Sequence, residues 1–323
     1  MFLATALALV PLLPQEAVNR VPAIAAKEWL NTDRPLGNWE KDLRGQVVLL
    51  DFWTYCCINC LHILPDLAKL EKDFVDEPFL VIGVHSKKFD QEGDAENIRQ
   101  AILRHGIRHP VAVDSDHAIW DSFGVRSWPT LVLVDPEGRE VGRLSGEGHY
   151  ATLKRAVRVV LDQHREKKTL AEGPLKVALE KPRDGTLAFP GKVLALPDSI
   201  LVADSGNGQI LQVATPGGNI LRRWGNLNDP QGMAVLGDQL YVAETGAHRI
   251  LRLQLAGDAR EVVAGTGKQA SFRPQEGPGL ETALNSPWAL EADGYFLHIA
   301  MAGSHQLWTL DTRSGELKHL AGS

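Results

Sequence analysis

One strand–turn–strand pattern occurs three times in the second half of the chain, and this internal repeat constrains the fold more than any other feature. The three copies occupy residues 200–210, 240–250 and 297–307. A proline precedes each copy, at Pro190, Pro230 and Pro287. These prolines are 40 and 57 residues apart, spacings that suit one four-stranded blade of a β-propeller per repeat. We therefore expect residues 188–323 to be all-β and to form about three blades.

Three blades do not close a ring, because propellers have about four to eight. The final residues 320–323, Leu-Ala-Gly-Ser, resemble the Val-Ala-Gly-Thr of residues 263–266, which lie 57 positions earlier. The sequence thus stops where a further connection would begin. We expect an incomplete ring, which is either a fragment of a propeller or a half that pairs with another copy.

In each copy an apolar strand ends beside a glycine, and a second strand starts a few residues later. These glycines are Gly206, Gly246 and Gly303. We expect them to adopt positive φ angles in a tight turn, because glycine tolerates that conformation. Asp204 and Glu244 precede the first two glycines, whereas Met301 stands at the third position. We interpret the two acids as turn stabilisers that accept backbone N–H groups, rather than as catalysts.

The first half of the chain alternates short apolar runs with amphipathic stretches, a pattern typical of an α/β domain. The apolar runs predict strands at 47–53, 79–84, 111–113, 130–134 and 140–144. Helical spacing predicts helices at 57–74, 95–104, 118–123 and 150–163. The last two strands should form a hairpin through the Asp-Pro-Glu-Gly turn at 135–138. We place this domain at residues 31–164 and a polar linker at 165–187.

Residues 1–30 form an N-terminal extension whose apolar stretch, 2–13, is too short to span a bilayer. A secretory signal has a positively charged residue before its apolar stretch, but no Lys or Arg precedes residues 2–13. We therefore favour an ordinary N-terminal helix, a cytoplasmic location and no stable membrane span. The alternative is a signal peptide within residues 1–25, with Ala23-Ile24-Ala25 as its cleavage site, and a periplasmic or other extracytoplasmic location.

The charge balance and the cysteine count narrow the class of protein. Lys plus Arg number 34 and Asp plus Glu number 40, so the formal net charge is −6, which argues against a nucleic-acid-binding protein. The only three cysteines are Cys56, Cys57 and Cys60. Because they lie within five residues, no network of disulfides supports the fold. We interpret these cysteines as chemically functional.

Cys57 and Cys60 have the spacing of a thiol exchange pair. Cys57 falls between a predicted strand and a predicted helix, where free backbone N–H groups and the helix dipole stabilise a thiolate. Cys60 is one helical turn further on, so its sulfur can attack a mixed disulfide formed at Cys57. The same spacing occurs in zinc sites, but the sequence has no second cysteine pair to complete one. We therefore expect redox chemistry without a metal.

Together, these motifs resemble the thioredoxin fold, most closely its TlpA and ResA-type branch. The resemblance covers about 120 residues and rests on Asp51-Phe52-Trp53, the Cys57–Cys60 pair, Pro65, and Trp128-Pro129-Thr130 before a strand. More narrowly, residues 53–60 followed by repeats such as Val-Ala-Asp-Ser-Gly at 202–206 resemble the thioredoxin-like, NHL-repeat-containing family over nearly the whole chain. The expected fold is thus an α/β thioredoxin-like domain followed by an incomplete NHL-type propeller.

The resemblance also implies roles for single residues. Cys57 would be the attacking thiol and Cys60 the resolving thiol, while Asp51 would be a buried carboxylate that assists proton transfer to Cys60. Pro129 would follow a cis peptide bond beside the disulfide, and Trp128 would offer its backbone to an extended client. Trp53, next to the cysteines, is a second candidate for client contact.

The function that follows is thiol–disulfide exchange with protein clients, without a cofactor, in which the propeller binds the client or other proteins. Ile58-Asn59 replaces the usual Gly-Pro between the cysteines, so the reduction potential cannot be taken from thioredoxin. Cys56 stands where thioredoxins commonly have tryptophan. It is an accessory thiol that could be inert filler, a regulatory partner or a metal ligand, and we favour filler because free cysteines are often simply buried.

Three other functions fit parts of the sequence. A redox-silent scaffold would use the propeller as a protein-binding surface, but it has no need of Cys57, Cys60 and Pro129 together. A thiol peroxidase would use Thr54, three residues before Cys57, although the proline of that family's motif is missing. A copper-binding protein would use Cys56 and Cys60 with one of three histidines. These histidines are His62, His85 and His149.

Overall fold

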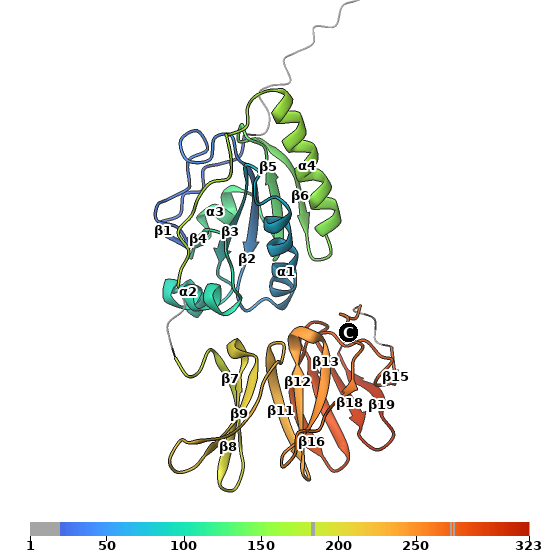
Figure 1. Cartoon of the computed structure of the whole chain (residues 1–323). Coiled ribbons are helices and arrows are strands. Elements are labelled where there is room, and N and C mark those ends of the chain that lie inside the picture. The colour runs from blue at the N-terminus through green and yellow to red at the C-terminus, as the bar shows by residue number, and fades with distance from the viewer. Residues whose placement is uncertain (1–19, 182–184, 272, 274, 323) are drawn as a thin grey trace, which may run out of the picture. The chain divides into compact units, whose positions relative to one another are not determined.

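The computed structural model describes residues 20–181, 185–271, 273 and 275–322, and the chain divides into two compact units at residues 181 and 182 (Figure 1). The apolar stretch 2–13, expected to form an N-terminal helix or, in the alternative, part of a signal peptide, lies outside the described residues. No helix among the described residues is both long and apolar enough to cross a membrane.

The first unit is built on a six-stranded mixed sheet with the order β1-β4-β3-β2-β5-β6. Strands β2, β3 and β4 run parallel, whereas β1, β5 and β6 pair antiparallel with their neighbours. The strands are β1 (Glu28–Leu30), β2 (Val47–Trp53), β3 (Phe79–Ser86), β4 (Val111–Asp114), β5 (Thr130–Val134) and β6 (Glu140–Ser145). All the strands expected from apolar runs are present, and β1 is an additional edge strand.

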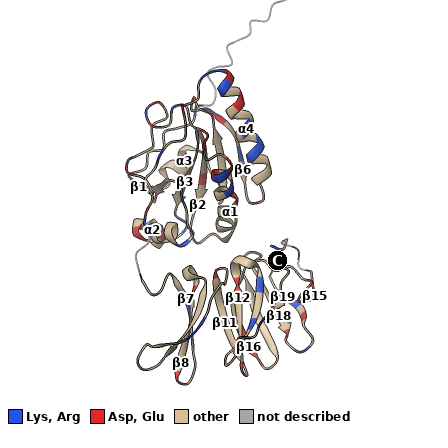
Figure 2. Ribbon diagram, in the orientation of Figure 1, with Lys and Arg blue, Asp and Glu red and all other residues tan. Residues whose placement is uncertain are grey.

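Helices cover both faces of this sheet (Figure 1). They are α1 (Ile58–Asp73), α2 (Ala95–Arg104), α3 (Ala118–Ser122) and α4 (Tyr150–Glu166). Because β2 alternates its side chains, Leu49 packs with α1, α2 and α4, whereas Leu50 packs with α3 and the segment before β2. Figure 2 shows charges of both signs along the exposed side of α4. The central strand β2, which leads to the cysteines, is thus buried on both sides.

Two segments differ from the expected boundaries because they pack on the first unit. Ile24, expected in a separate extension, is buried in the core. Leu170 and Val177, expected in the linker, contact the cores on the two faces of the sheet. The Asn31 side chain also accepts a hydrogen bond from the backbone N–H of Glu180 at 2.7 Å. Residues 169–180 therefore run back across this unit.

In its described residues, the second unit contains three antiparallel sheets, one for each repeat. The first is β7 (Pro190–Ala195), β8 (Ser199–Asp204), β9 (Gln209–Ala214) and β10 (Ile220–Trp224). The second is β11 (Pro230–Leu236), β12 (Gln239–Glu244), β13 (Arg249–Gln254) and β14 (Arg260–Ala264). The third is β16 (Pro287–Asp293), β17 (Phe296–Met301), β18 (Gln306–Asp311) and β19 (Glu316–Ala321), with the two-residue β15 (Gly277–Pro278) beside β19. The sheets are blade-like and do not form a closed ring.

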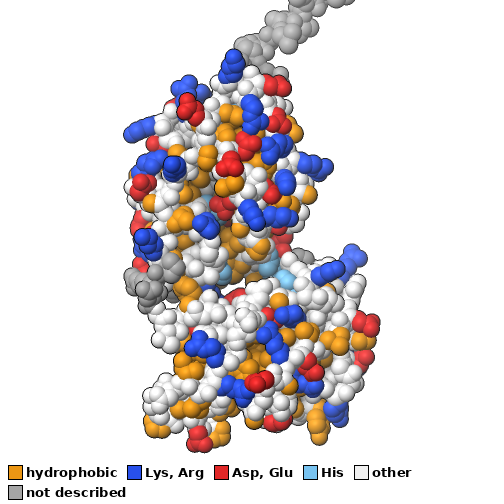
Figure 3. Space-filling view, viewed as in Figure 1, with side chains coloured by type: hydrophobic (Ala, Val, Ile, Leu, Met, Phe, Trp, Pro, Cys, Tyr) orange, Lys and Arg blue, Asp and Glu red, His pale blue; other side chains and the backbone are white. Residues whose placement is uncertain are grey.

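The middle sheet has both faces covered. Along β12, Leu240 and Val242 pack against the first sheet, whereas Tyr241 and Ala243 pack against the third. Each outer sheet packs on the middle sheet through one face only. Large apolar side chains remain exposed in these outer sheets, among them Val193, Leu221, Phe296, Leu307 and Leu320. Figure 3 shows hydrophobic side chains at the surface of this unit.

The turn glycines have a different role from the one expected. Gly206, Gly246 and Gly303 do not have positive φ angles; that conformation occurs two residues later in each copy, at Gly208, His248 and His305. The three glycines instead lie against the chain before the first strand of their own sheet. At Gly303 an added Cβ would come within 2.1 Å of Asn285 Oδ1. Glycine is required here by close approach rather than by backbone conformation.

The acids and hydroxyls of the repeats hold the sheets together. Asp204 accepts a hydrogen bond from the backbone N–H of Ala188 at 2.6 Å, and Glu244 accepts one from Asn228 at 2.8 Å. These backbone donors lie before the first strand of each sheet and not in the turn, so the two carboxylates bind the turn to that segment instead of capping the turn as expected. Ser205 donates to the Pro230 carbonyl of the next sheet, and Thr245 donates to that of Pro287. Ala302 occupies this position in the third copy and has no hydroxyl.

Candidate functional site

The three cysteines lie in the loop between β2 and α1, at the carboxyl end of the central strand. Cys57 is the N-cap residue of α1, with φ −89° and ψ 106°. Its carbonyl accepts hydrogen bonds from the N–H groups of Cys60 and Leu61 at 2.9 and 3.1 Å. The backbone N–H groups of Asn59 and Cys60 favour the Cys57 thiolate and so lower the pKa of Cys57. The first turn of α1 contains no acidic residue, so its N–H groups remain available to a thiolate.

The environments of Cys57 and Cys60 move their pKa values apart. A hydrogen bond from the Cys60 thiol, and then those from the backbone, lower the pKa of half-buried Cys57 to about 6. Burial, followed by the neighbouring Cys57 and Asp51, raises the pKa of Cys60 well above its usual range. At neutral pH the pair is thus a partly accessible thiolate that accepts a hydrogen bond from a buried thiol.

Asp51 lies in β2 behind the cysteines and is fully buried. Neither of its carboxylate oxygens has a hydrogen-bond partner within the described part of the chain. Burial raises the pKa of Asp51 to about 7, against the attraction of His109 and with a smaller contribution from Cys57. A carboxyl group with this pKa can hold or release a proton near neutral pH.

The Trp128–Pro129 segment lies next to the same loop. Thr130 at the start of β5 is opposite Phe52 in β2, so the two preceding residues are placed beside the end of β2. The Trp128–Pro129 peptide bond is cis, as the resemblance implies. Trp128 is half-buried, and its indole N–H donates to the Ser86 carbonyl at 3.1 Å. Trp128, Cys57 and Cys60 all pack around one hydrophobic core.

Trp53 is not at a surface that a client can reach. Its side chain is fully buried and packs edge-on against His85, with 4.9 Å between the ring centroids. The expected client contact therefore does not fit Trp53. His85 is buried as well, and its Nε2 accepts the backbone N–H of Tyr55 at 3.3 Å. Burial lowers the pKa of His85 to about 4, which keeps the ring neutral.

Cys56 is exposed, in contrast to the buried filler that we favoured. Its backbone N–H donates to Glu92 at 3.0 Å, and Glu92 is a residue that the sequence reasoning missed. Partial burial of the thiol, and then the neighbouring Glu92, raise the pKa of Cys56 to about 12. Glu92 also accepts a hydrogen bond from the hydroxyl of Thr54 at 2.7 Å. The Thr54 hydroxyl therefore donates to Glu92, which does not fit the peroxidase role considered for Thr54.

Each of the three histidines considered as copper ligands is hydrogen-bonded to another group of the protein. His62 pairs with Glu147 at 3.1 Å, and His149 bonds to the Ser145 carbonyl at 3.0 Å. Among the described residues, no group of three potential metal ligands includes a cysteine.

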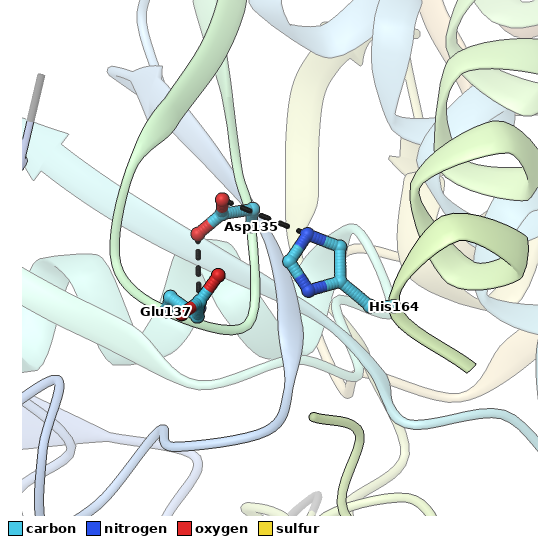
Figure 4. A group of neighbouring side chains, drawn as sticks. All are labelled: Asp135, Glu137 and His164. Carbon is cyan, nitrogen blue, oxygen red and sulfur yellow. Dashed lines mark hydrogen bonds and ion pairs between the residues drawn. The ribbon is translucent and has the colours of Figure 1, made fainter. Parts of the chain in front are cut away.

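One group with metal-ligand chemistry lies away from the cysteines, at the turn after β5 (Figure 4). It consists of Asp135, Glu137 and His164, whose donor atoms lie within 4.8 Å of one another. Asp135 accepts the N–H groups of Glu137 and Arg139, both at 2.9 Å, and thereby closes the turn. Glu137 is paired with Arg139, and His164 is bonded to Thr169. These contacts indicate that the three residues stabilise the turn and its packing against the end of α4.

Comparison with known proteins agrees with the first unit's fold. Residues 45–140 match a family model described as Thioredoxin-like, so this part of the chain is a thioredoxin-like domain. The thiol-disulfide oxidoreductase ResA of Bacillus anthracis is 28% identical over 107 residues, which cover 33% of this chain and 59% of that protein. The domain is thus related to thiol–disulfide oxidoreductases.

Two longer proteins are homologous over both units. Protein SUPPRESSOR OF QUENCHING 1, chloroplastic, of Arabidopsis thaliana is 38% identical over 336 residues, covering 96% of this chain and 32% of that protein. The human NHL repeat-containing protein 2 is 38% identical over 317 residues, covering 90% of this chain and 43% of that protein. The chain therefore spans about a third to two fifths of the length of these relatives.

Proposed function

We propose that this chain is a thiol–disulfide oxidoreductase that exchanges disulfides with protein clients through Cys57 and Cys60. The observation that carries the proposal is the contrast between the two thiols. Cys57 is half-buried at a helix N-terminus with a pKa of about 6, whereas Cys60 is buried and donates a hydrogen bond to it. A structural cysteine pair has no need of this arrangement.

The cycle moves two electrons from the protein to the client. The Cys57 thiolate attacks one sulfur of the client disulfide, so a Cys57–client bond forms and a client thiolate leaves. Cys60 then loses its proton to the Asp51 carboxylate and attacks the Cys57 sulfur. The second client thiolate leaves, and the protein holds a Cys57–Cys60 disulfide. An external dithiol restores both thiols and becomes a disulfide itself.

Client recognition is assigned to two regions. The half-buried Trp128 and the cis Pro129 lie beside the cysteine loop, where the Trp128 backbone can pair with an extended client. The blade-like unit supplies a larger protein-binding surface, an assignment supported by the exposed apolar side chains of its outer sheets. The thioredoxin-like fold is consistent with protein thiols as the general class of client.

The proposal is tested with a model protein disulfide and dithiothreitol as the reductant. Cys57→Ser should lower turnover to the uncatalysed rate, because serine is not a nucleophile at neutral pH. Serine is also a good N-cap residue, so α1 should remain intact, which circular dichroism can check. Cys60→Ser should instead accumulate a mixed disulfide between Cys57 and the client, visible by mass spectrometry.

The alternative function is a redox-silent scaffold, and the same samples distinguish the two. In glutathione buffers the wild-type chain should form a reversible Cys57–Cys60 disulfide, mapped after alkylation of free thiols. Full turnover in Cys57→Ser, or a pair that stays reduced in every buffer, would favour the scaffold.

A further inference from the structure

Glu92 joins two loops at the cysteine site through one buried carboxylate. It lies in a short 3-10 helix (Asp90–Gly93) between β3 and α2, and its side chain is 2% exposed. One carboxylate oxygen accepts hydrogen bonds from the Thr54 hydroxyl and from the Cys56 backbone N–H, at 2.7 and 3.0 Å. The other accepts the backbone N–H groups of Lys88 and Phe89, at 2.8 and 3.0 Å. Glu92 thus fixes the backbone directly before Cys57.

The carboxylate that accepts the Cys56 backbone N–H also carries a negative charge next to the Cys56 thiol, and this disfavours the Cys56 thiolate. Cys56 is more exposed than Cys57 and directly adjacent to it, so accessibility alone would make Cys56 the first thiol to meet a disulfide. The charged and titratable groups around the Cys56 thiol are Glu92, Lys88, Cys57 and Tyr55. A thiol next to a carboxylate tends to keep its proton, and a protonated thiol does not attack disulfides.

We propose that Glu92 selects Cys57 over Cys56 as the reacting thiol, by fixing the loop that places Cys57 at the helix N-terminus and by keeping a negative charge next to Cys56. This inference rests on the proposed function, since it names the residue that directs that chemistry to one sulfur. Glu92 touches neither Cys57 nor a client in the exchange step, so it is a positioning residue. It gives Cys56 a role distinct from filler, namely a neighbouring thiol that is kept unreactive.

The test compares the reactivity of the two thiols in the full, reduced chain. Iodoacetamide alkylates a thiolate with loss of iodide, and peptide mass spectrometry separates the rates at Cys56 and Cys57 over a range of pH. In the wild type, Cys57 should react at least about tenfold faster than Cys56 at neutral pH. In Glu92→Gln, which is isosteric but uncharged, the rate at Cys56 relative to Cys57 should rise by about tenfold or more. The oxidised variant should also contain disulfides that involve Cys56.

Asp114→Asn is the matched control. Asp114 is buried in the same unit and accepts hydrogen bonds from two backbone N–H groups and one hydroxyl, but it has no thiol partner. The control should lose stability without changing the ratio of the two alkylation rates. An unchanged ratio in folded Glu92→Gln, or an equal change in Asp114→Asn, would overturn the proposal.

A second variant covers the case in which Glu92→Gln does not fold. Glu92→Asp keeps the charge but is one methylene shorter, so it cannot reach both loops at once. The ratio should change in the same direction, and an unchanged ratio in this folded variant would also reject the proposal. Alkylation does not depend on disulfide turnover. A wild type that reacts at Cys57 but never reduces a client disulfide would therefore disprove the proposed function and leave the selection by Glu92 in place.

Discussion

Asp51 and Glu92 show how differently one domain can treat two buried carboxyl groups. Asp51 has no hydrogen-bond partner in the described chain, and its burial raises its pKa to about 7. Burial acts on Glu92 in the same direction, but its hydrogen bonds, led by those from Cys56 and Thr54, outweigh this effect and lower its pKa. One group is therefore suited to exchange a proton, and the other to remain a permanent charge.

The raised pKa of Asp51 predicts a pH-dependent gain in stability for Asp51→Asn. Below about pH 4 the carboxyl is protonated in both the folded and the unfolded chain. As the pH rises from 3.8 towards 7, the unfolded chain releases this proton while the folded chain keeps it, so the free energy of unfolding falls. The substitution removes this loss. It should therefore raise the free energy of unfolding by up to about 4 kcal/mol at pH 8, and by little at pH 4.

Urea titrations of both chains between pH 4 and 8 measure this difference. Asp114→Asn serves as a contrast, because it removes a carboxylate that accepts three hydrogen bonds, and it should be destabilising at pH 8. A stability difference between Asp51→Asn and the wild type that stays constant from pH 4 to 8 would contradict the assigned pKa.

The sequence predicts the part of the site that is local in the chain. Cys57 and Cys60 follow from their spacing, whereas the roles of Asp51 and Pro129 follow from the resemblance to the thioredoxin fold. Glu92 could not be found in this way, because it contacts Cys56 from 36 residues further along the chain. Glu92 also belongs to an acidic segment, residues 90–96, and such a pattern predicts a solvent-exposed segment. Only the folded path of the loop after β3 brings it to the cysteines.

At the scale of elements, the second and third sheets come into close backbone contact at Gly232 in β11. A Cβ added there would lie 2.7 Å from the Cα of Ala289 and 2.8 Å from the backbone carbonyl of Trp288, both in β16. Backbone atoms of a packed strand cannot turn aside as a flexible side chain can. The spacing between the second and third sheets is therefore set by the absence of a side chain at this position.

Gly232→Ala should push these two sheets apart and lower the stability of the second unit by about 2 kcal/mol or more. Gly225→Ala is the matched control, because no atom lies within 4 Å of its added Cβ and its φ angle is not positive. Chemical denaturation followed by tryptophan fluorescence measures both effects. Equal stabilities for the two variants would show that the sheets can yield at this contact.

The element boundaries could largely be predicted from periodicity, and the exceptions have physical causes. The edge strand β1 has three residues, too few to establish an alternating pattern. The predicted role of the turn glycines was wrong. Gly206 is constrained by its contacts with Ala188 and Phe189, and a local turn motif does not include these residues. The hydrogen bonds from Ser205 and Thr245 to the next sheet could not be predicted from the sequence either, because they join different repeats and not residues that are close in sequence.

At the scale of the whole molecule, the hydrophobic cores divide as the two units do. Two clusters lie on the faces of the thioredoxin-like sheet, and two others lie between the blade-like sheets. Among the described residues, each of these four clusters draws its members from one unit. Each unit thus has an apolar core of its own.

Calorimetry of the full chain should therefore show two separable unfolding transitions. At pH 8, Asp51→Asn should move only one transition, to higher temperature, and Gly232→Ala should move only the other, to lower temperature. If both substitutions moved the same transition, the units would unfold as one cooperative body.

Within the described residues, the first and third sheets each have one face that is not packed on the middle sheet, and this has a consequence for symmetry. The face of the first sheet that points away from the middle sheet and the corresponding face of the third sheet are different surfaces. Both sheets carry exposed apolar side chains. A contact that joins the first sheet of one copy to the third sheet of another uses two unlike surfaces, so it is heterologous. Each such addition leaves one surface of either kind unused at the ends of the assembly. Growth then stops only when the rotation between copies closes a cycle, and otherwise it continues as a filament.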